Sequence, residues 1–225
     1  HSLVVCGIND PDIQQMINGI NAMLGSYGNT IDLYRASYLR KGSDKEFMNL
    51  VSEMKSGTID ALFILGSNPV YTASGSGFVD ALKSVPFTIS FADRADETGS
   101  MVNVLACDHH YLESWNDHQP YDGYYAIAQP VIQPLFNTRQ AQDSLLRWSG
   151  SSSNYYDFVR SHWESSLFPN QSQYTFFDGF WNNAVHDGVV KLPFTREDVQ
   201  EYRAMDLSGP ANRVNSVAPV SYTHL

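Results

Sequence analysis

Cysteine is scarce in this sequence, which contains only Cys6 and Cys107 among its 225 residues. The two lie far apart and form no CxxC motif, so the chain encodes no zinc ribbon, no run of iron–sulfur ligands and no thioredoxin-like pair. Basic residues are also few, with 14 Lys and Arg against 24 Asp and Glu and a net charge of −10. This acidic balance opposes broad binding to nucleic acid or to anionic lipid.

Long apolar runs are absent as well. No stretch approaches the ~20 apolar residues that a transmembrane helix needs, so we expect no membrane span within these residues. The sequence has no GxGxxG and no GxxxxGK[ST] motif, which ranks a free nucleotide-binding module last among the functional hypotheses. The chain begins with His1 rather than an initiator methionine, inside an apolar run, so we expect it to be a piece of a longer chain.

Up to about residue 108, short apolar segments alternate with stretches of helical periodicity. The alternation predicts an α/β fold, a Rossmann-like parallel sheet with helices on both faces, because each crossover between parallel strands needs a helix to return the chain. The expected strands are 2–8, 30–36, 60–66, 86–93 and 104–108. The expected helices are 11–24, 43–56, 77–85 and 97–103. Segment 60–66 is apolar at successive positions, which is typical of a strand covered on both faces.

Local signals mark the ends of the first two helices. Asn9 or Asp10 can cap the first one, and Pro11 suits its first turn. Ser43 and Glu46 have the spacing of a capping box at the start of the second helix, and Gly57 ends it. These signals make the two helices the best-defined elements of the sequence.

The rest of the chain is rich in aromatics and is frequently interrupted by proline or glycine. We therefore expect residues 1–148 to form the α/β domain, and 149–225 an irregular, partly helical segment that wraps it and is poorly ordered at its C-terminal end. After the "SGSSS" break at 149–153 we expect a helix in which Tyr156, Val159 and Trp163 share one face. Residues 190–225 contain three prolines and predict no regular element.

The segment "LFILGSNPV" ends an apolar strand in a tetrapeptide that packing alone does not require. Ligands of open parallel sheets bind beyond the carboxyl ends of the strands. Gly66 would let a ligand approach the backbone, while Ser67 and Asn68 offer donors and acceptors. The alternative is a plain turn in which Asn68 hydrogen-bonds to its own backbone, and local physics leaves both interpretations open.

A second strand end, "FADRADETGSM", brings Asp93, Asp96, Glu97 and Thr98 together before an expected helix. Carboxylates at a helix N-terminus are favoured by the helix dipole, which explains at least one of them without a ligand. The same groups could bind the edge of a base, since a carboxylate accepts hydrogen bonds from N–H groups. The two strand ends together form the candidate site.

The densest group of titratable residues lies at 107–125, "CDHHYLESWNDHQPYDGYY". It contains no HExxH motif, and the adjacent His109 and His110 would point in different directions on a helix or a strand. We expect no protein-bound metal here. These side chains are expected to hydrogen-bond to backbone groups and to fix a long loop.

Three segments taken in order, "LFILGSNPV", "VPFTISFADRADETGSMVNVLACDHHYLESW" and "GYYAIAQPVIQPLFNTR", resemble the molybdopterin oxidoreductase family, which includes formate dehydrogenase and dimethyl sulfoxide reductase. The resemblance covers roughly residues 1–145. The positions that match the family pattern are Gly66, Asn68, Pro69, Asp93, Glu97, Thr98, Leu105, Glu113 and Gly123. The resemblance implies a site for the guanine end of a molybdopterin guanine dinucleotide, either working or vestigial. Its residues would be Gly66, Ser67, Asn68, Asp93 and Thr98.

Within that family, "DHHYLESWNDHQPYDGYYAIAQPVIQPLFNTRQ" and "FWNNAVHDGV" are most similar to the molybdopterin-like subunit of alternative complex III, a quinol-oxidising bacterial membrane complex. This resemblance implies an electron-transport scaffold without catalysis or cofactor in this segment, and iron–sulfur clusters elsewhere in the full chain. Cytochrome c and quinol-binding membrane subunits would be its partners, on the periplasmic side of the inner membrane. The alternative is part of an active molybdopterin enzyme, such as a polysulfide or tetrathionate reductase.

One departure from the wider family favours the scaffold. Ala106 stands where the family usually has proline, and the aromatics and histidines that follow would crowd the channel for the second pterin nucleotide. No cysteine or serine is placed to coordinate molybdenum, because Cys107 falls in the wrong part of the pattern.

Overall fold

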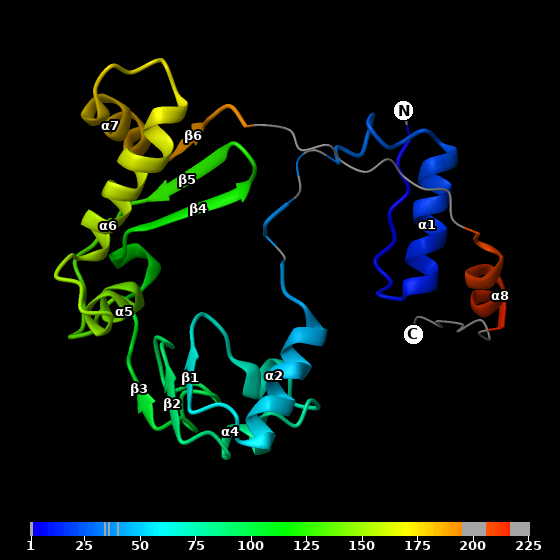
Figure 1. Ribbon diagram of the computed structural model, residues 1–225, viewed down its shortest axis with the longest axis horizontal. Helices are drawn as coiled ribbons and strands as arrows, with labels where there is room; N and C mark the ends of the chain where they lie inside the picture. Colours follow the sequence, from blue (N-terminus) through cyan, green and yellow to red (C-terminus); the bar gives the residue numbers. More distant parts are fainter. Residues whose placement is uncertain (1, 34, 36, 40, 195–205, 217–225) are drawn as a thin grey trace, which may run out of the picture. The chain divides into compact units, whose positions relative to one another are not determined.

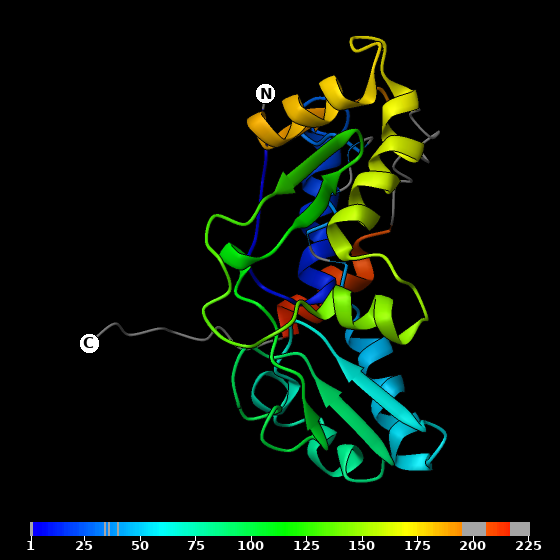
Figure 2. The same cartoon turned by 90° about the vertical axis from the view of Figure 1, so that its left-hand side faces the viewer.

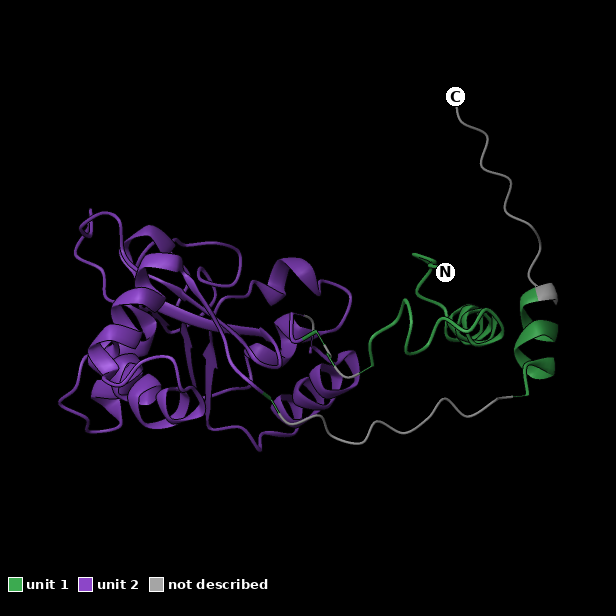
Figure 3. Cartoon of the chain, turned by 90° about the horizontal axis from the view of Figure 1, so that it is seen from above, with its two compact units in different colours: residues 1–37, 194–225 green, residues 38–193 purple. Residues whose placement is uncertain are grey.

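The computed structural model describes residues 2–33, 35, 37–39, 41–194 and 206–216. The chain divides into two compact units, one of residues 1–37 with 194–225 and one of residues 38–193 (Figure 3). The boundary expected at residue 148 falls inside the second unit, and the division into 1–148 and 149–225 stays a prediction. The expected poor order of the C-terminal end concerns residues 217–225, which lie outside the described residues.

The first unit is built on one capped helix, α1, Pro11–Met23. The Asp10 side chain accepts hydrogen bonds from the backbone of Asp12 and Ile13, at 2.9 and 3.0 Å, so this N-terminus is confirmed. A second helix, α8, Ser208–Ser216, packs along α1 in this unit (Figure 1). The sequence predicted no element in 190–225, and α8 is the largest departure from that expectation within the described residues.

The strand expected at 2–8 is wrong, because these residues form no sheet pairing. Val4 instead exchanges two hydrogen bonds with the buried side chain of Asn21, which accepts from the backbone N–H at 2.9 Å and donates to the carbonyl at 2.8 Å. Among the described part of 30–36, the chain turns around the carbonyl of Ser26 and makes only an isolated bridge between Tyr27 and Ile31. The strand expected there is also wrong.

The second unit contains the predicted parallel sheet. Its strands are β1, Ala61–Ile64, β2, Phe87–Ser90, and β3, Val104–Leu105, in the order β1-β2-β3. Both pairings are parallel, and the arrows of the three strands run in the same direction in Figure 2. The α/β class is confirmed, with three strands rather than five within the described residues.

Helices lie on both faces of this sheet. On one face, α2, Asp44–Ser56, and α4, Phe78–Leu82, enclose a core to which Ile64 of β1 contributes. On the other face α5, Ala141–Trp148, places Trp148 against Phe63 and Phe91, with ring centroids 6.1 and 5.7 Å apart. Phe63 is nevertheless 48% exposed, so the expectation that this strand is covered on both faces holds for only one of them.

The start and end of α2 follow the sequence signals. The Ser43 hydroxyl accepts from the Glu46 backbone N–H at 3.3 Å, and Gly57 ends the helix in the left-handed conformation with φ 74°. The helix expected at 97–103 is wrong, because this segment forms successive turns. Asp96 closes them by accepting from the backbone of Gly99 at 2.6 Å.

Residues 149–225 are partly helical within the described part, as expected. The sequence did not predict that a second, antiparallel sheet would form after residue 108. This sheet consists of β4, Asn116–Tyr121, β5, Tyr124–Ala128, and β6, Val189–Lys191. The helices α6, Tyr155–His162, and α7, Phe177–Asp187, pack beside it. Two short helical segments join them, the π-helix η2, Trp163–Leu167, and the 3-10 helix η3, Phe168–Asn170. The helix after "SGSSS" is thus confirmed.

This second sheet has its own aromatic core. Trp163, Phe180 and Trp181 are buried in it. Trp163 is fully buried, and its ring meets that of Trp181 edge to face at a centroid distance of 5.7 Å. The face expected to combine Tyr156, Val159 and Trp163 does point into this core.

Candidate functional site

The predicted turn at the end of β1 is present and leads directly into a short helix. Gly66 adopts a left-handed φ of 61°, a conformation that favours glycine over residues with a side chain. Pro69 then occupies the first turn of α3, Pro69–Thr72, an element that the sequence interpretation missed. The N–P pair was the available signal, because proline suits the first turn of a helix.

Asn68 joins this turn to the end of β2. Its amide nitrogen donates to the Glu97 carboxylate at 2.7 Å, and its amide oxygen accepts from the hydroxyl of Thr98 at 2.7 Å and from the Thr98 backbone N–H at 3.2 Å. Thr98 in turn accepts from the backbone N–H of Val70 at 3.1 Å. We call Asn68, Glu97 and Thr98 the loop link. The plain turn, in which Asn68 bonds to its own backbone, is therefore wrong.

The loop link changes what Asn68 and Thr98 can do. Thr98 is completely buried, so it lies beneath the surface that a ligand would touch. The Asn68 amide has its oxygen and nitrogen engaged by protein groups. The hydrogen bond from Asn68 is also the main cause that lowers the pKa of Glu97 from its usual value. These residues position the strand ends rather than offer open hydrogen-bonding sites.

Asp93 lies at the same edge of the sheet but outside the loop link. Its carboxylate accepts two hydrogen bonds from the guanidinium of Arg94, at 2.9 and 3.0 Å. The Arg94 hydrogen bond lowers the pKa of Asp93, so this carboxylate is held in its charged form. It can accept further hydrogen bonds from a ligand, because both residues are exposed.

A cavity of about 340 Å³ brings most of the predicted site residues together. It is lined by Gly66, Ser67, Asn68, Phe91, Ala92, Asp93, Asp96, Asp108 and His109. Four of the five predicted residues therefore border one cavity, and Thr98 is the exception. Asp108 and His109 were assigned only to a loop, although their position just after β3 could have placed them at this edge.

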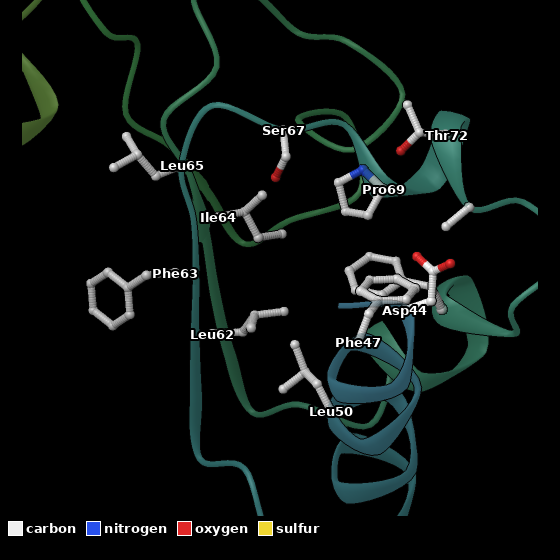
Figure 4. Close-up of a pocket in the computed structure, with 12 residues that line it drawn as sticks. Asp44, Phe47, Leu50, Leu62, Phe63, Ile64, Leu65, Ser67, Pro69 and Thr72 are labelled. Carbon is white, nitrogen blue, oxygen red and sulfur yellow. The ribbon is translucent and has the colours of Figure 1, made fainter. Parts of the chain in front are cut away.

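A second cavity, of about 560 Å³, lies on the side of β1 that faces α2. Figure 4 shows Phe47, Leu50 and Leu62 around it, with Asp44 near its polar end. Ser67 borders both cavities. The G-S-N-P turn thus contributes to two cavities, one lined mainly by apolar side chains and one with three aspartates.

The titratable residues after β3 do fix a long loop. Asp108 accepts from the backbone of His109 and of Ala141, both at 2.8 Å, although burial raises its pKa. Glu113 accepts from the backbone of Leu135 at 2.9 Å and of His110 at 3.0 Å, and these bonds lower its pKa. Within the described residues, no three His, Cys, Asp or Glu side chains form a group that could hold a metal ion.

The lining of the 340 Å³ cavity can be tested against a molybdopterin guanine dinucleotide. Asp93, Asp96 and Asp108 contribute carboxylates, whereas no Lys or Arg is among its lining residues. Such a lining can accept hydrogen bonds from the N–H edge of a guanine but repels a diphosphate. With Asn68 and Thr98 bonded to each other, these residues do not fit the phosphate part of the cofactor, and only Ser67 and Asp93 suit its base.

The comparisons with known proteins agree with the resemblance in outline. No protein-family model matches the chain. Over 149 residues the chain is 30% identical to the menaquinone reductase, molybdopterin-binding-like subunit, of Nitratidesulfovibrio vulgaris strain Hildenborough. The match covers 58% of this chain and 22% of that relative, so the chain spans about a fifth of the relative's length. This partial match supports the similarity to molybdopterin oxidoreductases.

Proposed function

We propose that this chain is part of the molybdopterin-like subunit of a quinol-oxidising respiratory complex of the alternative complex III type. It acts there as a scaffold and performs no chemistry of its own. The loop link is the observation that supports this proposal most. Asn68 and Thr98, which the resemblance assigns to the cofactor, instead hold two strand-end loops together. We expect such an arrangement in a domain that has kept its fold but lost its cofactor, because the polar groups that once bound the ligand then bond to one another.

The proposed partners are cytochrome c and quinol-binding membrane subunits, on the periplasmic side of the inner membrane. Iron–sulfur clusters would lie elsewhere in the full chain. The exposed face of the parallel sheet supports docking, because Phe63, Leu65 and Trp148 are 48%, 47% and 50% exposed, and exposed apolar groups of this size are typical of interfaces. No helix among the described residues is long and apolar enough to cross a membrane.

A second candidate is part of an active molybdopterin enzyme. Ser67 and Asp93 on the 340 Å³ cavity favour it, since a carboxylate and a hydroxyl can bind the edge of a guanine. A side-chain atom added at Gly66 would meet nothing within 4 Å, so the backbone there is open to a ligand. When bound, the cofactor would supply the redox chemistry, and these residues would only orient its base.

The partner proposal predicts the composition of the intact complex. When the full-length subunit is tagged and purified from detergent-solubilised bacterial membranes, we expect c-type cytochrome and integral membrane subunits to elute with it in constant ratio. The measurement is haem staining and mass spectrometry of the eluted complex after size exclusion. A subunit that is recovered alone in the soluble fraction, with no haem protein bound, would refute the assignment to a membrane complex.

A further inference from the structure

A separate cavity of about 470 Å³ lies at α5 and the loop that leads from α5 to α6. It is lined by Arg139, Asp143, Arg147, Ser151, Ser152, Ser153 and Asn154. We call it the arginine pocket. Two guanidinium groups and a run of hydroxyls in one cavity are unusual in a chain with 24 acidic and 14 basic residues, and neither the resemblance nor the proposed function accounts for them.

The first arginine of the pocket is held in place by the fold. The backbone N–H of Arg139 donates to the carbonyl of Cys107 at 3.4 Å, and its Nε donates to the hydroxyl of the buried Ser144 at 2.9 Å. Arg139 is nevertheless exposed as a residue. Ser144 engages only Nε of this guanidinium, so the N–H groups of the two terminal nitrogens remain as donors for a ligand.

The second arginine lies on α5 itself. Arg147 lies eight residues after Arg139 and is exposed at the last turn of α5. Within the described part of the chain, neither arginine forms an ion pair with a carboxylate. Both guanidinium groups are therefore available to an anionic ligand.

The acidic residue of the pocket is Asp143, midway between the two arginines in the sequence and on α5. Its carboxylate accepts a hydrogen bond from the backbone N–H of Tyr155 at 2.6 Å, at the start of α6. Asp143 therefore joins the two helices. The three charged groups of the pocket sum to one net positive charge, so the pocket attracts an anion, although Asp143 weakens that attraction.

The serine loop completes the pocket. Gly150 turns the chain in the left-handed conformation with φ 85°, and the backbone of Ser151 donates to the carbonyl of Leu146 at 2.9 Å. Ser153 donates its backbone N–H to the Ser151 hydroxyl at 3.2 Å. The loop is thus folded back over the end of α5, with the side chains of Ser152 and Ser153 exposed beside the arginines.

From this arrangement we propose that the arginine pocket binds a phosphoryl group. Arginine presents planar pairs of N–H donors that match the oxygens of phosphate, and hydroxyls add further donors. The volume of about 470 Å³ lies within the range of sites for small molecules. The phosphoryl group belongs either to a free phosphorylated metabolite or to the headgroup of an anionic phospholipid, which present the same chemistry to the two arginines.

The test measures the affinity of the full chain for pyrophosphate, the probe, by isothermal titration calorimetry. We expect Arg147→Gln to weaken binding about tenfold or more, because hydrogen bonds to a charged group are lost. Asp143→Asn keeps an acceptor for Tyr155 but removes the negative charge, so it should tighten binding by about threefold or more. The two substitutions therefore shift affinity in opposite directions.

The matched control is Arg160→Gln, which removes an arginine of α6 outside the pocket, where it pairs with Asp178 and lies 4.9 Å from the ring centroid of Phe177. It should leave pyrophosphate affinity unchanged. A second measurement tests binding to lipid, by sedimentation of the chain with phosphatidylcholine vesicles that contain or lack phosphatidylglycerol. Arg147-dependent binding of pyrophosphate supports a free phosphorylated ligand, and Arg147-dependent binding to the anionic vesicles alone supports a lipid headgroup. If Arg147→Gln and Arg160→Gln have equal effects, or neither probe binds, the proposal is overturned.

Discussion

Replacing Trp163 by alanine is expected to lower the free energy of unfolding by about 3–5 kcal/mol, the range for truncation of a large buried aromatic side chain. Trp163 is completely buried and contacts both Phe180 and Trp181 in the aromatic core. Its indole nitrogen also donates to the Asp117 carboxylate at 2.9 Å, across to β4. The substitution would leave a cavity and remove a hydrogen bond between the helical layer and the second sheet.

The free energy of unfolding is measured in urea and monitored by far-ultraviolet circular dichroism. This signal reports backbone structure, so it does not depend on fluorescence from the tryptophan that is removed. Phe176→Ala is the control, since Phe176 is 78% exposed and its loss should change stability by no more than about 0.5 kcal/mol. Equal effects of the two substitutions would show that the helices after residue 154 do not pack as described.

The second large effect is expected from Asn68→Ala, which removes the loop link. The Thr98 hydroxyl would lose its acceptor while remaining buried. An unsatisfied buried polar group costs about 1–3 kcal/mol, so we expect the free energy of unfolding to fall by that amount. The same measurement in urea applies, with proteolysis of the strand-end loops as a second readout.

Ser67→Ala is the control for this prediction, because Ser67 is the exposed neighbour of Asn68 on the same cavity. It should leave stability nearly unchanged. The pair of variants also separates the two functional hypotheses. If Asn68 serves a bound cofactor instead of the loop link, Asn68→Ala would leave the stability of the cofactor-free protein unaltered and would lower cofactor content in the full-length subunit.

The elements that the sequence predicted well are those whose signals are local. The Asp10 cap of α1 and the Ser43 and Gly57 ends of α2 each depend on hydrogen bonds within a few residues. The parallel order of β1, β2 and β3 follows from the crossover rule, which needs only the alternation of strands and helices. Short-range chemistry was sufficient for these parts.

The errors arose where a distant partner decides the conformation. Segment 2–8 has the composition of a strand, yet the Asn21 side chain takes both backbone hydrogen bonds of Val4. The reverse holds for β4, whose sequence "NDHQPY" lacks apolar alternation and includes a proline. It becomes a strand because β5 pairs with it and Asp117 receives the hydrogen bond of Trp163. Neither partner is visible in the local pattern.

For the candidate site, the sequence predicted which residues would lie together but not the hydrogen bonds among them. The sequence placed Ser67, Asn68 and Asp93 at one edge of the sheet, and they border one cavity. It did not predict that Asn68 would reach Thr98, because a side-chain bond between two loops depends on the register of β1 and β2. Because β1 and β2 pair in this register, Asn68 and Thr98 bond to each other in the loop link, whereas the sequence analysis expected them to contact a ligand.

We propose that these strand ends form an inherited nucleotide site that no longer holds a molybdopterin cofactor. The most direct test of this proposal is the molybdenum and pterin content of the full-length subunit, purified without oxygen from its native host. We predict molybdenum far below one atom per polypeptide by elemental mass spectrometry, and no pterin fluorescence after oxidation. Stoichiometric molybdenum together with pterin would contradict the account and favour the active enzyme.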